Sequence, residues 1–130
     1  MNWHALLDEA IETTGKYQSV APDVFAGFGL MGKAAKKNGA LSEKSKELIA
    51  LGIAISTRCE ICIAYHVNSL VRLETTRDEF CEALEMISYM GGGPSISTAP
   101  KLLKLSINSL LRPIIYKLNK TQLIKFLNLG

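Results

Sequence analysis

Apolar residues recur along this chain at the spacing of one face of an α-helix, whereas the strict alternation of a half-buried strand is almost absent. An apolar stripe at i, i+3, i+4 and i+7 is the pattern of a helix that buries one face. The chain has 130 residues, a length that fits one domain with a modest core. We therefore expect an all-α fold, a compact bundle of about six or seven helices that forms a single domain over residues 1–130.

Start and stop signals set the expected helix boundaries. Pro22 suits a first helical turn, Ser42 is a favoured N-cap, and Thr76 opens a capping box. Gly91-Gly92-Gly93 is interpreted as a helix stop, because the strand and the Gly-Lys-Ser/Thr of a phosphate cradle are missing around it. The signals predict helices over residues 3–13, which Gly15 would end, and over 22–37, 43–56, 59–73, 77–90, 99–111 and 114–129.

The net charge of +3 conceals an uneven distribution. Residues 1–85 hold nine Lys/Arg and all twelve Asp/Glu, whereas residues 86–130 hold six Lys/Arg and no acid. The atypical basic and apolar tail over residues 101–130 is compatible with nucleic acid, an anionic membrane surface or an acidic partner. Its lysines are scattered and not interleaved with aromatic residues, which favours a solvated helix face, so we expect no nucleic-acid partner.

Targeting segments are missing from the sequence pattern. No apolar run approaches the roughly 20 residues of a membrane-spanning helix, and the first residues lack the basic and apolar regions of a secretory signal. We therefore expect a cytoplasmic protein without a membrane span. In a reducing cytosol three cysteines do not suggest a structural disulfide framework, and a closely spaced pair is expected to be catalytic or metal-binding.

Cys59-Glu60-Ile61-Cys62 places two thiols three residues apart on one face of a predicted helix. Two such sulfurs can close into a disulfide if the first lies at the helix entrance, where free backbone donors and the helix dipole favour a thiolate. His66 follows Cys62 by four residues, so its ring should lie over the turn that carries Cys62 and exchange a proton with that thiol.

Glu47 lies at the edge of the most apolar predicted helix, so its carboxylate needs a partner. The short connection before Cys59 predicts that helices 43–56 and 59–73 pack antiparallel, which makes His66 or a cysteine the expected partner. Spacing alone leaves three interpretations open: a redox pair, a metal site with His66 and Glu47 as further ligands, and inert core thiols. Redox chemistry is favoured, because structural zinc usually takes two ligand pairs and one is present, and no metal or other cofactor is expected.

The series of Glu47, eleven residues, Cys59-x-x-Cys62, three residues and His66 resembles a known signature. It is similar to that of the alkylhydroperoxidase D-like branch of the carboxymuconolactone decarboxylase superfamily. The resemblance covers about residues 42–100 and extends more loosely from Trp3, and the sequence departs from the family after Lys101. Three further segments share the likeness: 46–51, 62–67 and 91–94.

The resemblance implies an all-α subunit in a homo-trimer or homo-hexamer that reduces hydroperoxides. Its reductant would be a dithiol such as dihydrolipoamide or a redox partner protein. Cys62 would be the nucleophile that peroxide oxidises to sulfenic acid, and Cys59 the proton donor and resolving thiol. Glu47 and His66 would form the proton relay. The helix dipole alone favours Cys59 as the thiolate, whereas the His66 spacing and the resemblance favour Cys62.

The predicted function is therefore an antioxidant thiol-dependent peroxidase or disulfide reductase, an oxidoreductase. One alternative is a lactone enzyme of the carboxymuconolactone decarboxylase type, although that chemistry has no need of vicinal thiols. Another is a non-enzymatic metal-binding or redox-sensing module.

Apolar residues outside this motif are assigned either to the core, to a pocket or to contacts between subunits. Phe25, Phe28, Leu30 and Met31 are compatible with a substrate pocket, but core packing is the favoured interpretation. Cys81 is interpreted as a small buried hydrophobe, because no second cysteine lies near it in sequence. With 48% hydrophobic residues and an apolar segment over 114–129, the chain is expected to bury surface between subunits.

Overall fold

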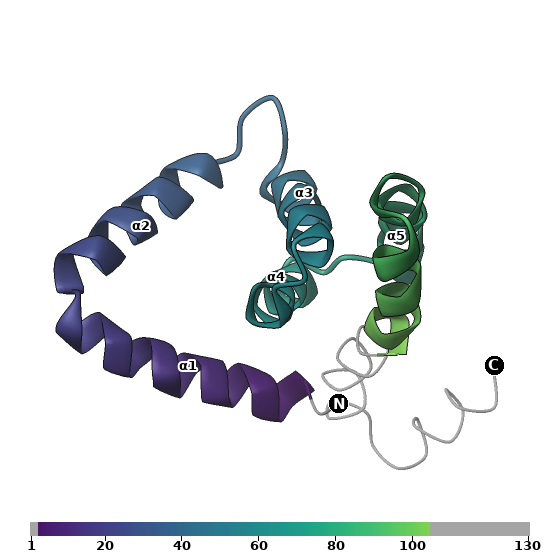
Figure 1. Cartoon of the computed structure of the whole chain (residues 1–130). Coiled ribbons are helices and arrows are strands. Elements are labelled where there is room, and N and C mark those ends of the chain that lie inside the picture. Colours follow the sequence, from purple (N-terminus) through teal and green to yellow (C-terminus); the bar gives the residue numbers. More distant parts are fainter. Residues whose placement is uncertain (1–2, 105–130) are drawn as a thin grey trace, which may run out of the picture.

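The computed structural model describes residues 3–104, which are helical apart from short connections and contain no strand. Figure 1 shows the helices in chain order. They are α1 (Trp3–Val20), α2 (Pro22–Ala35), α3 (Glu43–Ser56), α4 (Glu60–Arg72) and α5 (Arg77–Gly91), followed by a helical segment over residues 93–104. The predicted all-α class is confirmed, and the cysteine pair lies at the start of the fourth helix, as predicted.

Local signals explain where these helices begin. Pro22 occupies the first turn of α2, where a missing backbone N–H breaks no helical hydrogen bond. The Ser42 side chain accepts a hydrogen bond from the backbone N–H of Ser45 at the start of α3. At α5, Thr76 and Glu79 form the predicted capping box, in which each side chain accepts the backbone N–H of the other residue.

The core lies between α3, α4, α5 and the helical segment 93–104. α3 packs against both α4 and α5, and α4 also contacts α1. The cluster of buried side chains is aliphatic except for one aromatic ring: Leu51, Ala54, Ile55, Ile63, Val67, Leu70, Phe80, Leu84 and Leu102. Burying one large apolar side chain contributes about 1.5–3 kcal/mol, so this cluster holds α3 and α4 in a fixed relation.

α1 contacts α4 and buries Ala10, whereas α2 follows it as the outer part of an open arm (Figure 1). The rings of Tyr17 and Phe25 join the two helices, with centroids 5.3 Å apart and planes nearly perpendicular. No side chain of α2 is buried. The expectation that Phe25, Phe28, Leu30 and Met31 pack in the core is therefore wrong, and the last three are 69%, 69% and 61% exposed. The cause is that α2 packs mainly against α1 and leaves its other apolar faces uncovered.

Two predicted boundaries are wrong. Gly15 does not end α1, which continues to Val20, because a glycine inside a helix costs only about 1 kcal/mol relative to alanine. The helical segment 93–104 begins six residues earlier than the predicted start at Ala99. Pro94 then falls in its first turn, a position that proline favours.

The glycine run ends α5 where the sequence predicted. Gly92 follows the helix with φ of +68°, a left-handed conformation that suits glycine. A Cβ atom on Gly91 would collide with the side chain of Ser95. Glycine at position 91 therefore leaves room for the Ser95 side chain at the junction between α5 and the segment 93–104.

None of the described helices is long and apolar enough to cross a membrane. The predicted helix over 114–129 and nearly all of the basic tail lie outside the described residues, as does the second half of the predicted helix over 99–111.

Candidate redox site

The turn between α3 and α4 places Cys59 at the start of α4. Arg58 has a left-handed backbone with φ of +57°. Its N–H donates to the carbonyl of Ile55 at 3.1 Å, and the N–H of Cys59 donates to the carbonyl of Ala54 at 3.0 Å. These two bonds form a Schellman motif, which ends α3 and reverses the chain within a few residues. Cys59 is therefore both the last residue of this motif and the N-cap of α4.

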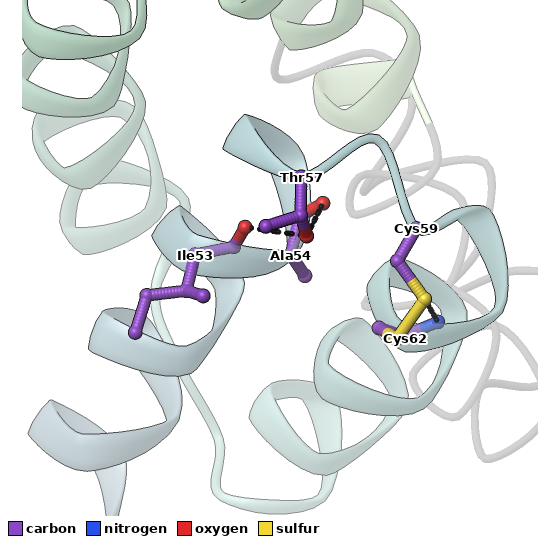
Figure 2. The surroundings of a disulfide bond; sticks show 5 residues. All are labelled: Ile53, Ala54, Thr57, Cys59 and Cys62. Carbon is purple, nitrogen blue, oxygen red and sulfur yellow. Dashed lines mark hydrogen bonds between the residues drawn. A yellow bond between two sulfur atoms is a disulfide. The ribbon is translucent and has the colours of Figure 1, made fainter.

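A disulfide joins Cys59 to Cys62, and their Cα atoms are 5.2 Å apart. The backbone N–H of Cys62 donates to the sulfur of Cys59 at 3.3 Å, so the first turn of α4 supplies a hydrogen bond to its own N-cap. Figure 2 shows the disulfide beside the last turn of α3, where the Thr57 hydroxyl donates to the carbonyl of Ile53 at 2.9 Å. The expected proximity of the two sulfurs is confirmed.

Glu47 and His66 form the second part of the site. Glu47 lies on α3 and is buried, with 1% of its surface exposed. Its Oε2 is 2.6 Å from Nδ1 of His66 on α4, the distance of a strong, charge-assisted hydrogen bond. The predicted partnership of the buried carboxylate with His66 is confirmed. Because Nδ1 is engaged, Nε2 is the ring nitrogen that can exchange a proton with a thiol.

The other carboxylate oxygen of Glu47 has a partner that sequence reasoning missed. Oε1 is buried and makes no hydrogen bond within the described part of the chain, but the ammonium of Lys36 lies 3.5 Å from it. Lys36 is the C-cap of α2, and its Cε lies 3.8 Å from the position of a Cβ built on Gly32. The side chain therefore runs back along α2. Helical periodicity carries no signal for this contact, since a non-helical connection separates Lys36 from α3.

The site opens into a cleft of about 820 Å³. Cys62 and His66 line it from α4, whereas Cys59 is not among its lining residues. α2 supplies another wall with Phe25 and Phe28, so the alternative reading of these two rings as pocket residues fits the structure. A cleft of this size accommodates an organic molecule and is larger than hydrogen peroxide requires.

The described residues 3–104 include the cysteines and most of the other side chains that bind metals in proteins. In that range no three His, Cys, Asp or Glu side chains come together in an arrangement that would hold a metal ion. Both sulfurs of the motif are used by the disulfide, and the thiolate is the form that binds metal. Cys81 is a free thiol on α5 and is partly buried.

Residues 22–105 match the sequence profile of the carboxymuconolactone decarboxylase family, which is more than half of the chain. The chain therefore belongs to this family. The resemblance drawn from the motif is confirmed at the level of the superfamily.

Individual relatives agree with this assignment. A Cupriavidus necator protein described as uncharacterized is 36% identical over 97 residues, which is 75% of this chain and 86% of that protein. A Paracoccus denitrificans protein described as uncharacterized protein 4 in the cox locus is 28% identical over 75% of this chain and 87% of its own length. The crystal structure of an apo carboxymuconolactone decarboxylase family protein from Legionella pneumophila is similar, with a TM-score of 0.79. It is 36% identical and covers 83% of this chain and 96% of its own.

Proposed function

We propose that this protein is a thiol-dependent hydroperoxide reductase, an antioxidant oxidoreductase that cycles between a Cys59/Cys62 dithiol and the disulfide. The observation that carries the proposal is one cleft lined by both Cys62 of the disulfide and His66, whose Nδ1 lies 2.6 Å from buried Glu47. A thiol beside a histidine that a carboxylate orients is the arrangement of an activated nucleophile. Lactone chemistry would leave the cysteine pair without a role.

The oxidative half of the cycle begins at Cys62, which lines the cleft together with His66. The Cys62 thiolate attacks one peroxide oxygen, the O–O bond breaks, and Cys62 becomes a sulfenic acid. The alkoxide takes a proton through the relay of Cys59, His66 and Glu47 and leaves as the alcohol. The Cys59 thiolate then attacks the sulfur of Cys62, the S–O bond breaks, and hydroxide leaves as water with a proton from the relay.

The reductive half uses a dithiol such as dihydrolipoamide or a redox partner protein. One reductant thiolate attacks the Cys62 sulfur from the cleft, and Cys59 leaves as a thiolate. The Cys62 N–H, 3.3 Å from the Cys59 sulfur, stabilises the departing charge, and a stabilised thiolate leaves faster. The second reductant thiol then releases Cys62. In sum, one hydroperoxide and one dithiol become an alcohol, water and an oxidised dithiol.

The proposal includes a cytoplasmic homo-trimer or homo-hexamer. A reducing compartment would keep regenerating the dithiol. The arm made by α1 and α2 leaves large apolar side chains uncovered in the single chain, and a second copy is the simplest way to cover them. The exposed set includes Tyr17 at 58%, Val20 at 79%, Val24 at 64%, Phe28 at 69% and Met31 at 61%.

A single-turnover experiment tests the thiol chemistry. One equivalent of an organic hydroperoxide is added to the reduced protein, and thiols are counted and assigned by peptide mass spectrometry. Two thiols should disappear and Cys81 should stay free. In Cys59→Ser, a sulfenic acid on Cys62 should be trapped by dimedone, because the resolving thiol is gone. Survival of all three thiols, or trapping on Cys59 in Cys62→Ser at the wild-type rate, would reject the assigned roles.

A further inference from the structure

One oxygen of the buried Glu47 carboxylate takes no part in the contact with His66. Oε2 bonds to His66, whereas Oε1 makes no hydrogen bond within residues 3–104. A buried carboxylate without compensation is strongly destabilising, so its surroundings need a counter-charge. The Lys36 ammonium, 3.5 Å from Oε1, supplies it. Among the ion pairs of the described residues, no other lysine or arginine is a partner of Glu47.

The contact with Glu47, and not packing of the aliphatic stem, accounts for the position of the Lys36 side chain. Its Cε lies 3.8 Å from the position that a Cβ atom would have on Gly32, and the side chain remains 46% exposed. No side chain of α2 is buried, so general packing does not draw Lys36 inward. Lys33 and Lys37 line the same cleft, but neither forms an ion pair with Glu47. The ammonium of Lys36 therefore connects the α1–α2 arm to the redox site.

We propose that Lys36 is a positioning residue of the redox site, an inference that rests on the proposed function. Its ammonium stabilises the carboxylate form of Glu47, which accepts the Nδ1 proton of His66 and leaves Nε2 free to act as a base toward Cys62. Without this ammonium, the buried carboxylate loses its lysine counter-charge, and the negative charge left at the site disfavours formation of a thiolate on Cys62.

The other charged groups of the cleft set the background for this effect. Among the described residues, the titratable side chains that line it are Lys33 from α2, Lys36 and Lys37 directly after α2, Glu43 from α3, and Cys62, Tyr65 and His66 from α4. Glu43 is paired with Arg72 at 2.8 Å, and Thr14, the lining residue from the described side chains of α1, does not titrate. Removing Lys33 should therefore act on the relay only through a screened field, whereas removing Lys36 breaks a contact.

The test is the pH dependence of Cys62 alkylation in the reduced full-length protein, with the modified residue assigned by mass spectrometry. Loss of a nearby cation raises the proton affinity of the site, so the midpoint should rise in Lys36→Met. The expected rise is about one pH unit, at the low end for a nearby charge, because Lys36 contacts Glu47 and not Cys62 and is 46% exposed. Lys36→Arg keeps the charge and should restore the wild-type midpoint. Lys33→Met, the matched control on the same helix, should shift the midpoint less than half as far.

Two results would overturn the inference. One is a Lys36→Met profile that overlays the wild-type profile in a protein with unchanged circular dichroism and thermal unfolding. The other is an equal shift in Lys36→Met and Lys33→Met, which would assign the effect to the overall charge of the cleft. If Lys36→Met folds poorly, the pH profile of Lys36→Gln is compared with those of the wild type and Lys33→Met instead. Failure of the proposed function would show in the wild type itself, as a Cys62 midpoint near the ordinary thiol value of about 8.5 and survival of both thiols in peroxide.

Discussion

Replacing Glu47 with glutamine removes one charge from the centre of the site and keeps the shape of the side chain. The amide oxygen can still accept the Nδ1 proton of His66, so the geometry should survive. What disappears is the negative charge that faces His66 at 2.6 Å and Lys36 at 3.5 Å. The substitution therefore separates a structural role of Glu47 from a role in proton transfer.

The stability effect of Glu47→Gln should be small, because two contributions oppose each other. Removing a carboxylate that is 1% exposed relieves a desolvation penalty. Breaking a buried ion pair is usually costly because the remaining charge is stranded without solvent. Here the remaining charge, Lys36, is 46% exposed and stays hydrated. We expect the free energy of unfolding to change by no more than about 1 kcal/mol.

The kinetic effect of Glu47→Gln should be far larger. Losing a general acid–base group typically slows proton transfer by about 10²–10⁴-fold, and the formation of the Cys62 thiolate should slow accordingly. His66→Asn should cause a similar loss. The double variant should lose little more than either single variant, because members of one relay act as a unit.

The assay is the rate of Cys62 alkylation against pH in the reduced wild type, both single variants and the double variant. Glu85→Gln, which removes an exposed acid from α5, is the matched control and should leave the profile unchanged. Identical profiles for wild type and Glu47→Gln would remove Glu47 from the mechanism and leave a simple cysteine–histidine pair. Fully additive losses in the double variant would show that the two residues act independently.

The fold makes three more outcomes measurable. Light scattering at micromolar concentration should show a trimer or hexamer. Met31→Lys places a charge at a site that is 61% exposed on the apolar arm and should weaken this assembly. A monomeric wild type would contradict the prediction. Glu74 has φ of +56°, a left-handed backbone conformation that glycine adopts with less strain than glutamate. Glu74→Gly should therefore raise the free energy of unfolding by about 0.5–1 kcal/mol in denaturant titrations, and a decrease would contradict this. The Thr76 backbone N–H and the Lys44 ammonium hold the pKa of Glu79 below its ordinary value of 4.5. The stabilisation from Glu79 should therefore be full above that pH and decrease as the pH falls through the lowered pKa. The difference in free energy of unfolding between wild type and Glu79→Gln should disappear in acid, and a difference that does not change with pH would refute the prediction.

The sequence predicted the parts of the site that depend on local rules. Cys59 and Cys62 lie on one helical turn, and a short turn makes α3 and α4 neighbours. The apolar surroundings of Glu47 therefore led to His66 or a cysteine as its partner, and the 2.6 Å contact shows that the partner is His66. The N-caps at Ser42 and Thr76 were readable for the same reason, because a cap involves residues within one turn.

The sequence was less informative where distant segments decide the outcome. The sequence pattern of an apolar helix such as α2 is the same whether the helix packs into the core of its own chain or leaves its apolar face exposed for another chain. The sequence therefore did not predict the exposure of Phe28. Lys36 reads as an ordinary surface lysine until the fold brings it 3.5 Å from Glu47. Gly15 illustrates a different limit: its helix-breaking cost is small enough for the surrounding helix to override.

The most direct test of the central claim is peroxide consumption with dihydrolipoamide as the reductant, comparing the intact chain with Cys62→Ser. The wild type should consume an organic hydroperoxide in step with oxidation of the dithiol, and Cys81→Ser should keep the wild-type rate. Cys62→Ser should fall to the uncatalysed background. Equal consumption by wild type and Cys62→Ser would contradict the assignment of Cys62 as the peroxide-reactive thiol of a hydroperoxide reductase.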